Sequence, residues 1–259
     1  TQSVHLLQSV IMSLKQPFNH LRINGWSFFT LCVAAIISVP ILVVLSYIFV
    51  PTQGIWSHLV DTVLSNYIFN SIGLLIGVGS LTLIVGTGCA WLVTMCDFPG
   101  RKIFEWSLLL PLAVPAYVIA YTYTGLLDFA GPVQELLRDI FGWTSRRDYW
   151  FPPVRSLGGA IVMFTLVLYP YVYMLSRAAF LEQSICVLEV SRTLGRTPWQ
   201  SFKEVAFPLA RPSIAAGMAL ALMETLNDFG TVHFFAVDTF TTGIYRTWFG
   251  MGEPAAAAQ

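Results

Sequence analysis

Charged residues are scarce in this sequence. Only 11% of its 259 residues are Asp, Glu, Lys or Arg, whereas a soluble domain usually carries about 25%. The 14 acidic and 14 basic residues cancel, so net charge gives no argument for a nucleic-acid partner, and none is expected. A Walker A sequence and a nucleophile elbow are also missing from the sequence. The composition therefore indicates a protein whose solvent is a lipid bilayer, and any ATPase chemistry is expected to lie on another chain.

Four long segments contain no charged residue at all, and these are residues 26–50, 67–96, 106–127 and 156–176. Each reaches the roughly 20 residues that a helix needs to cross about 30 Å of hydrocarbon. A helix satisfies its own backbone hydrogen bonds, which lipid cannot do. Buried helices of a large soluble protein are the alternative, but four such segments in a chain of this length argue against it. We therefore predict an all-α, polytopic transmembrane helical bundle.

A fifth, weaker span is predicted to start after Arg211 and Pro212 and to run towards Val237. Residues 255–259 resemble the start of another helix, which gives five to six spans in an incomplete bundle. Proline within the spans is expected to bend the helices, and it occurs at Pro40, Pro111, Pro115 and Pro170. Small residues such as Gly73 and Gly77 are expected to let neighbouring helices pack closely.

Basic residues divide unequally between the two sides of the predicted membrane. Nine precede the first span or lie between the second and third or the fourth and fifth spans, against five on the opposite side. Because cytoplasmic loops carry the excess of Lys and Arg, the N-terminus is predicted to be cytoplasmic. Most of the five lie in one outside loop, residues 128–155. Its aromatic and charged residues fit either an interfacial belt or a docking surface for an extracytoplasmic partner.

A polar loop between the fourth and fifth spans, residues 181–211, has clear signals for two short helices. Gly195 is expected to end the first helix, because glycine accepts the left-handed conformation. Thr197 is a predicted N-cap, Pro198 suits the first helical position, and the glutamine three residues after Thr197 completes a capping box. The second helix is expected to end at Pro208. Such a two-helix knob can fill a groove on another protein.

The spacing in this loop resembles the EAA loop of bacterial binding-protein-dependent ABC importers. That pattern reads Glu-Ala-Ala, three residues, Gly, nine residues, Ile, any residue, Leu-Pro. This chain keeps Glu189, Gly195 and Pro208, and it departs at Val190, Ser191, Val205 and Phe207. Three further segments resemble the iron(III) permease branch of the family: LPLAVPAYVIAYTYTG from Leu110, LYPYVYMLSRAAFLEQ from Leu168, and ETLNDFGTV followed by DTFTTGIYRTWFG from Glu224.

The resemblance implies the type I ABC importer permease architecture, as the first half of a fused two-half permease in the bacterial inner membrane. Residues 1–25 would form an N-terminal cytoplasmic or interfacial segment, and residues 26–65 the first transmembrane helix and an outside loop. Residues 66–259 would form the permease core, with the coupling loop at 181–211. The implied partners are two ATP-binding subunits, an extracytoplasmic substrate-binding protein and the second permease half. ATP would be bound by the ATP-binding subunits, with no cofactor or metal on this chain.

The same resemblance gives roles to residues of the loop. Glu189 would contact an ATP-binding subunit, Gly195 would form the turn, and Pro208 would fix the exit angle of the chain. The expected apolar anchors are Leu194, Trp199 and Phe202, and the remaining members of the coupling set are Arg196 and Val205. Ferric iron is the implied cargo. The alternatives are the same machinery with thiamine or an organophosphonate, and a channel or structural subunit without ATP coupling.

Two acidic residues in the predicted fifth span form a second candidate site. Glu224 and Asp228 are four residues apart and would share one helix face, with Glu224 near the middle of the bilayer. Ionisable groups at that depth normally face a bundle interior or a watery path. One interpretation is a translocation pathway that includes Tyr121 and Tyr173. The other is a structural role, in which the carboxylates pair with polar groups on neighbouring helices.

Overall fold

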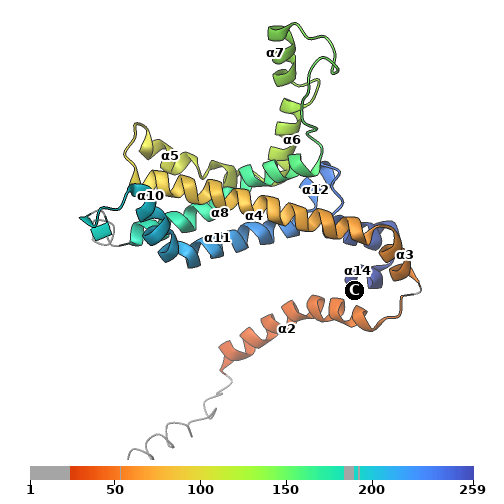
Figure 1. Ribbon diagram of the computed structural model, residues 1–259. Coiled ribbons are helices and arrows are strands. Elements are labelled where there is room, and N and C mark those ends of the chain that lie inside the picture. Colours follow the sequence, from red (N-terminus) through yellow and green to blue (C-terminus); the bar gives the residue numbers. More distant parts are fainter. Residues whose placement is uncertain (1–23, 53, 184–189, 192) are drawn as a thin grey trace, which may run out of the picture. The chain divides into compact units, whose positions relative to one another are not determined.

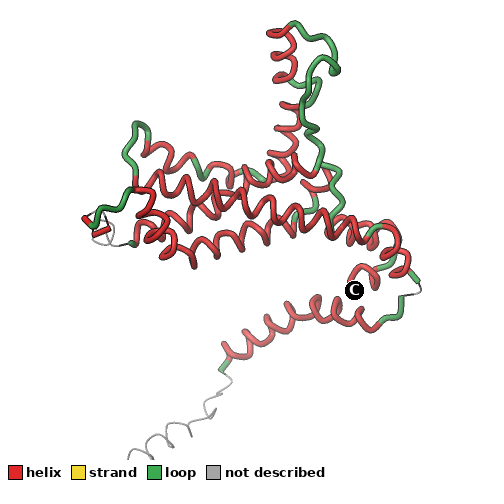
Figure 2. The backbone as a smooth tube through the Cα atoms, in the orientation of Figure 1, coloured by secondary structure: helices red, strands yellow, loops and turns green. Residues whose placement is uncertain are grey.

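The computed structural model describes residues 24–52, 54–183, 190–191 and 193–259, and every regular element in these ranges is a helix (Figure 2). Four of these helices are long and apolar enough to cross a membrane, and a bent pair of helices would make a fifth span. The prediction of an all-α bundle of membrane-spanning helices is confirmed.

The chain divides into two units. The first contains α2 (Gly25–Ser46) and the short turn η1 (Tyr47–Phe49), and no side chain of α2 is buried. An apolar helix with no buried residue is suited to lipid on all sides. The second unit runs from Thr52 to Ala257 and contains the bundle and the polar loop.

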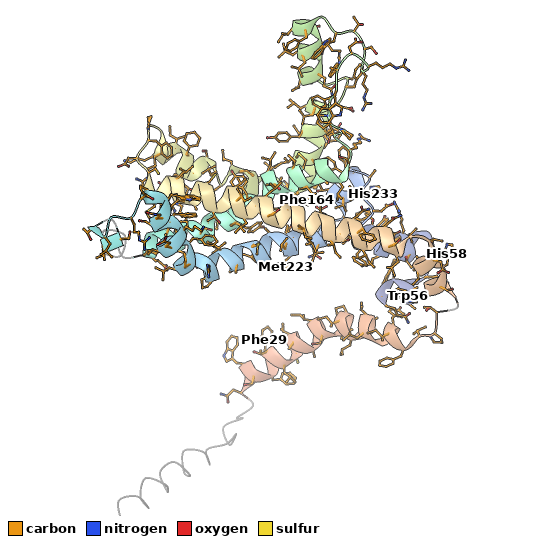
Figure 3. All side chains as sticks on the ribbon, viewed as in Figure 1. Phe29, Trp56, His58, Phe164, Met223 and His233 are labelled. Carbon is orange, nitrogen blue, oxygen red and sulfur yellow. The ribbon has the colours of Figure 1, made fainter. Side chains whose placement is uncertain are left out.

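Three long helices form the bundle of the second unit, namely α4 (Leu64–Met95), α8 (Leu157–Glu182) and α11 (Phe207–Asn227) (Figure 1). The short helix α3 (Ile55–Thr62) leads into α4. Side chains of α8 fill the interior. Phe164 lies within the bundle with 1% of its surface exposed, while Met223 lies on the outer side of α11 (Figure 3).

The three helices approach one another most closely around Val172, which is fully buried on α8. A Cβ atom added to Gly86 of α4 would lie 2.7 Å from the Cβ of Val172, and one added to Gly217 of α11 would lie 2.8 Å from its Cα. Both distances are too short for real carbon atoms. The bundle therefore depends on the missing side chains at these two glycines, as expected for helices that pack in a membrane.

The third predicted span, residues 106–127, is not a continuous helix. The chain forms α5 (Arg101–Ser107), η2 (Leu110–Ala113) and α6 (Ala116–Leu127), and the helix axis turns by 100° at the break after η2. Pro115 lacks an N–H, and the residue before a proline is pushed out of the helical region. Val114 is accordingly extended, with ψ 130°. The helix α7 (Pro132–Phe141) follows α6.

The fifth span begins earlier than predicted. The helix α10 (Pro198–Ser201) passes through the π-helical turn η3 (Phe202–Ala206) directly into α11, so that one helix runs from Pro198 to Asn227. The expectation that the second short helix ends at Pro208 is therefore wrong. In the wide turn the N–H of Phe207 donates to the carbonyl of Phe202, the five-residue spacing of a π-helical turn.

The fifth span also ends earlier than predicted, at Asn227 instead of near Val237. Asp228 is extended (φ −72°, ψ 127°), and its carboxylate accepts hydrogen bonds from the N–H groups of Thr231 at 2.7 Å and Val232 at 3.3 Å. It thus caps α12 (Gly230–Phe234), a role for which aspartate is well suited. The chain then forms α13 (Phe240–Tyr245), η4 (Arg246–Gly250) and α14 (Pro254–Ala258).

Replacing Gly86 by alanine should loosen the bundle, because the new methyl group would collide with α8. We expect a loss of about 1–3 kcal/mol, the usual cost of overpacking, seen as a lower midpoint in thermal unfolding of detergent-solubilised protein. Gly88→Ala is the control, since no atom lies within 4 Å of a Cβ atom at that position of the same helix. Equal unfolding midpoints for the two variants would contradict the close approach at Val172.

Replacing Asp228 by alanine should weaken α12, because two backbone N–H groups would lose their acceptor. The expected cost is about 0.5–2 kcal/mol, measured by the same thermal unfolding. Asp228→Asn should retain most of the stability, since an asparagine side chain also caps helices well. If Asn destabilises as much as Ala, the negative charge rather than the cap is what matters at this position.

Candidate functional site

The polar loop forms two short helical segments around Gly195. Residues 190, 191 and 193 are helical, and Gly195 has φ +78°. The N–H of Arg196 donates to the carbonyl of Ser191 at 3.1 Å, the six-residue closure of a helix that ends at a left-handed glycine. The expected helix stop at Gly195 is therefore confirmed. Glu189, the first residue of the coupling set, lies outside the described residues.

The predicted capping box of the second segment is present. The Thr197 hydroxyl accepts a hydrogen bond from the Gln200 N–H at 3.3 Å, and the Thr197 N–H donates to the Gln200 side chain at 2.9 Å. Pro198 occupies the first position of α10. These contacts are local in sequence, and they fix the start of the helix without help from the rest of the protein.

Two side-chain contacts tie the segments together. The hydroxyl groups of Ser191 and Ser201 lie 2.7 Å apart and both residues are buried. Arg196 forms a salt bridge with Glu204 at 3.1 Å, and both side chains are about half exposed. An exposed pair adds little stability, so we regard the buried serine contact as the main tie. We call residues 190, 191 and 193–206 the coupling knob.

Among the described residues, the outer surface of the coupling knob carries three exposed apolar side chains, of which Leu194 at 76% and Trp199 at 68% are more exposed than Val190 at 55%. Phe202, the third expected anchor, is only partly exposed, and its ring stacks on that of Trp199 with a centroid distance of 5.3 Å. Its ring packs inward, with its centroid 4.8 Å from that of Trp91 on α4 and 6.4 Å from that of Phe180 on α8. Phe202 therefore attaches the knob to the bundle.

The base of the coupling knob is well packed. Phe180 and Ala206 are almost completely buried, and Gln183 at the end of α8 donates from its side chain to the carbonyl of Ala206 at 2.9 Å. Val205 and Pro208 are partly buried beside this contact. The knob thus has an exposed apolar tip, and its base is packed against the bundle. The sequence shows the caps but gives no sign of which aromatic residues meet beneath them.

The second candidate site is not assembled as predicted. Glu224 lies exposed in the last turn of α11, while Asp228 lies beyond the helix end as the cap of α12. The two carboxylates therefore do not share a helix face. For Asp228, the structural interpretation fits the observed contacts, although its partners are Thr231 and Val232.

The two tyrosines grouped with these carboxylates lie in different surroundings. Tyr121 on α6 is 70% exposed and lines a shallow groove with Tyr117, Gly230 and Phe234. Tyr173 is fully buried, and its hydroxyl donates to the carbonyl of Glu105 at 3.0 Å. The structure gives Tyr173 a packing role, and it does not bring it together with Glu224.

The long loop after α6 is held by its own contacts. The ring of Trp143 stacks between those of Phe141 and Tyr149, with both centroid distances at 4.7 Å. The N–H groups of Thr144 and Ser145 donate to the Asp148 carboxylate and lower its pKa. Trp150 remains 84% exposed. The belt and docking interpretations of this loop both stay predictions.

Comparison with known proteins gives relatives for most of the chain. The molybdenum transport system permease protein ModB of Escherichia coli (strain K12) is 31% identical over 155 residues, which are 60% of this chain and 62% of that protein. The Fe(3+)-transport system permease protein FbpB 2 of Haemophilus influenzae is 29% identical over 171 residues, 66% of this chain and 29% of that protein. The putative 2-aminoethylphosphonate transport system permease protein PhnU of Salmonella choleraesuis is 25% identical, over 90% of this chain and 83% of that protein.

The fold has a counterpart among solved structures. A bacterial alginate ABC transporter, in complex with a periplasmic protein that carries an alginate pentasaccharide, contains a chain that matches with a TM-score of 0.66. The match covers 90% of this chain and 86% of the other at 17% identity, and it concerns the fold alone. A family model matches residues 82–252, which include the coupling knob and all three helices of the bundle at least in part. The chain belongs to the family of binding-protein-dependent transport system inner membrane components.

Proposed function

We propose that this chain is a permease subunit of an ATP-driven importer and that the coupling knob transmits ATP-driven motion to the membrane helices. The observation that carries the proposal is the exposed pair Leu194 and Trp199 on two capped helices whose base is buried between α4 and α8. A rigid knob with apolar anchors and a charged rim is suited to a groove on a partner protein.

The ATP-binding subunits are the proposed partners at this surface. Two such subunits that close on ATP would pull on the knob and shift the bundle between two packings, a two-state change driven by nucleotide. In the topology that we propose, the N-terminus and the knob are cytoplasmic. An extracytoplasmic binding protein would deliver the cargo on the opposite side, and a second permease half, fused or separate, would complete the pathway.

Gly195→Leu should uncouple the transporter. A leucine held in the left-handed conformation costs about 1–2 kcal/mol, and the turn that joins the two halves of the knob would open. We expect the variant to insert in the membrane but to lose binding-protein-stimulated ATP hydrolysis, measured in proteoliposomes with the ATP-binding subunits. Normal transport by this variant would contradict the proposed role of the knob.

Gly142→Leu is the matched control for that experiment. Gly142 ends α7 with φ +69°, and no atom lies within 4 Å of an added Cβ atom at either glycine. Both variants therefore place the same side chain in the same strained conformation on an open surface. Stimulated ATP hydrolysis should survive in Gly142→Leu. Loss of hydrolysis in both variants would indicate general damage instead of uncoupling.

Ferric iron is the cargo that we propose, supported by the similarity to FbpB 2 and by the segments from Leu110, Leu168 and Glu224. The similarity to PhnU over 90% of this chain favours 2-aminoethylphosphonate as the second candidate. Uptake of radioactive iron should fall in cells that lack this chain and return when it is restored. Unchanged iron uptake, with loss of phosphonate uptake, would replace the first cargo by the second and leave the proposed coupling intact.

A further inference from the structure

The end of α5 is attached to α8 by an unusual set of bonds to its backbone. Where α5 passes into η2, the N–H of Leu109 donates to the carbonyl of Trp106, and the N–H of Leu112 donates to that of Leu109. This tighter spacing leaves the carbonyls of Glu105 and Leu108 without the usual donor four residues on. Both carbonyls accept from side chains of α8 instead.

Tyr173 and Tyr169 are the donors. The Tyr173 hydroxyl lies 3.0 Å from the Glu105 carbonyl, and the Tyr169 hydroxyl lies 2.9 Å from the Leu108 carbonyl. One turn further along α8, the guanidinium of Arg177 forms an ion pair with the Glu105 carboxylate, and both side chains are less than a third exposed. Tyr169, Tyr173 and Arg177 are spaced by four residues and so lie on one face of α8. We call these three residues and Glu105 the α5 clasp.

The α5 clasp lies directly beside the base of the coupling knob. Phe180, three residues after Arg177, packs against Phe202 and Trp91, and Gln183 binds the Ala206 carbonyl one turn later. The contacts that hold the knob are therefore made by the same end of α8 that holds the clasp.

The segment formed by α5 and η2 ends at the break in the third span. From the clasp the chain passes through η2 to Val114 and Pro115, where its direction changes by 100°, and then enters α6. Tyr117 and Tyr121 of α6 are exposed beside Phe234 of α12. The segment of α5 and η2 is bonded to α8 at one end, and its other end lies at a break in the helix. A hinge motion at this break could therefore move α6 relative to α8.

We propose that Tyr169, Tyr173 and Arg177 are positioning residues for transport, which make α5 and η2 move with α8 so that motion of the coupling knob reaches α6. This inference rests on the proposed function of the knob. It assigns the α5 clasp to the transmission of motion, and not to contact with cargo or with the ATP-binding subunit. What matters is then that residues 105 and 177 form an ion pair, and not which of the two carries the negative charge.

Exchange of the two charges tests the ion pair. Glu105→Arg and Arg177→Glu, each alone, should lower transport per ATP hydrolysed by about tenfold, within the usual range of coupling between sites. ATP hydrolysis measured without the binding protein should be unchanged, since the knob is untouched. The double exchange should restore most of the transport, because the pair is re-formed with its signs reversed.

Arg101→Gln is the matched control. Arg101 forms an ion pair with Asp97 in the loop just before α5 and donates to the Thr94 carbonyl of α4, and neither contact joins α5 to α8. Transport per ATP should be unchanged in this variant. Full coupling in both single exchanges, or a double exchange no better than the singles, would overturn the proposed role of the α5 clasp.

Spin labels on α5 and α8 supply a readout that does not depend on transport. Ile103 and Leu181 are both exposed and suit labelling. In the assembled transporter, the mean distance between the two labels should be the same with and without ATP. The distribution of distances should broaden when Tyr169→Phe and Tyr173→Phe are combined. A distance that changes with ATP in the parent would overturn the inference. Absence of any ATP-dependent uptake by the parent would instead reject the proposed function, while the label distance still reports on the clasp.

Discussion

The close approach of three backbones at Val172 is the constraint on which the rest of the bundle depends. Gly86 and Gly217 supply no side chain on either side of this residue, so α4 and α11 both reach α8 at nearly the same level. Lipid offers no hydrophobic force to press helices together, and close van der Waals packing takes that part. With α8 held from two sides, its third face is free to bind the end of α5.

This arrangement makes α8 the common partner of every part that the proposed function needs. From the middle of α8, the hydroxyl groups of Tyr169 and Tyr173 donate to backbone carbonyls at the end of α5. At the C-terminal end of α8, Phe180 and Gln183 contact the coupling knob. Packed interiors do not deform continuously. A force on the knob is therefore expected to move a connected body, and the broken third span is the place where that body can give.

The parts of the structure that sequence alone predicted are those decided by neighbours along the chain. Thr197 and Gln200 cap a helix through their own backbone groups, and Gly195 turns the chain because it has no Cβ atom. Proline was a poorer guide, because its effect depends on tertiary contacts: Pro40 and Pro170 lie inside continuous helices, while Pro115 lies at a 100° break. Likewise, no local rule places Phe202 against Trp91, which is 111 positions away in the printed sequence.

The π-helical turn η3 has a consequence for the rotational phase of the chain. Buried residues of α11 follow one another at steps of three or four, through Ala210, Ile214, Gly217 and Ala221. The step from Ser201 to Ala206 is five. In an ordinary helix each residue advances by about 100° around the axis, so residues five apart would face different sides. The π-helical turn accommodates the extra residue and keeps Ser201 on the side where it meets Ser191. Deleting one residue from η3 would leave the helix continuous and rotate the whole tip of the knob, with Trp199, to another side of the span.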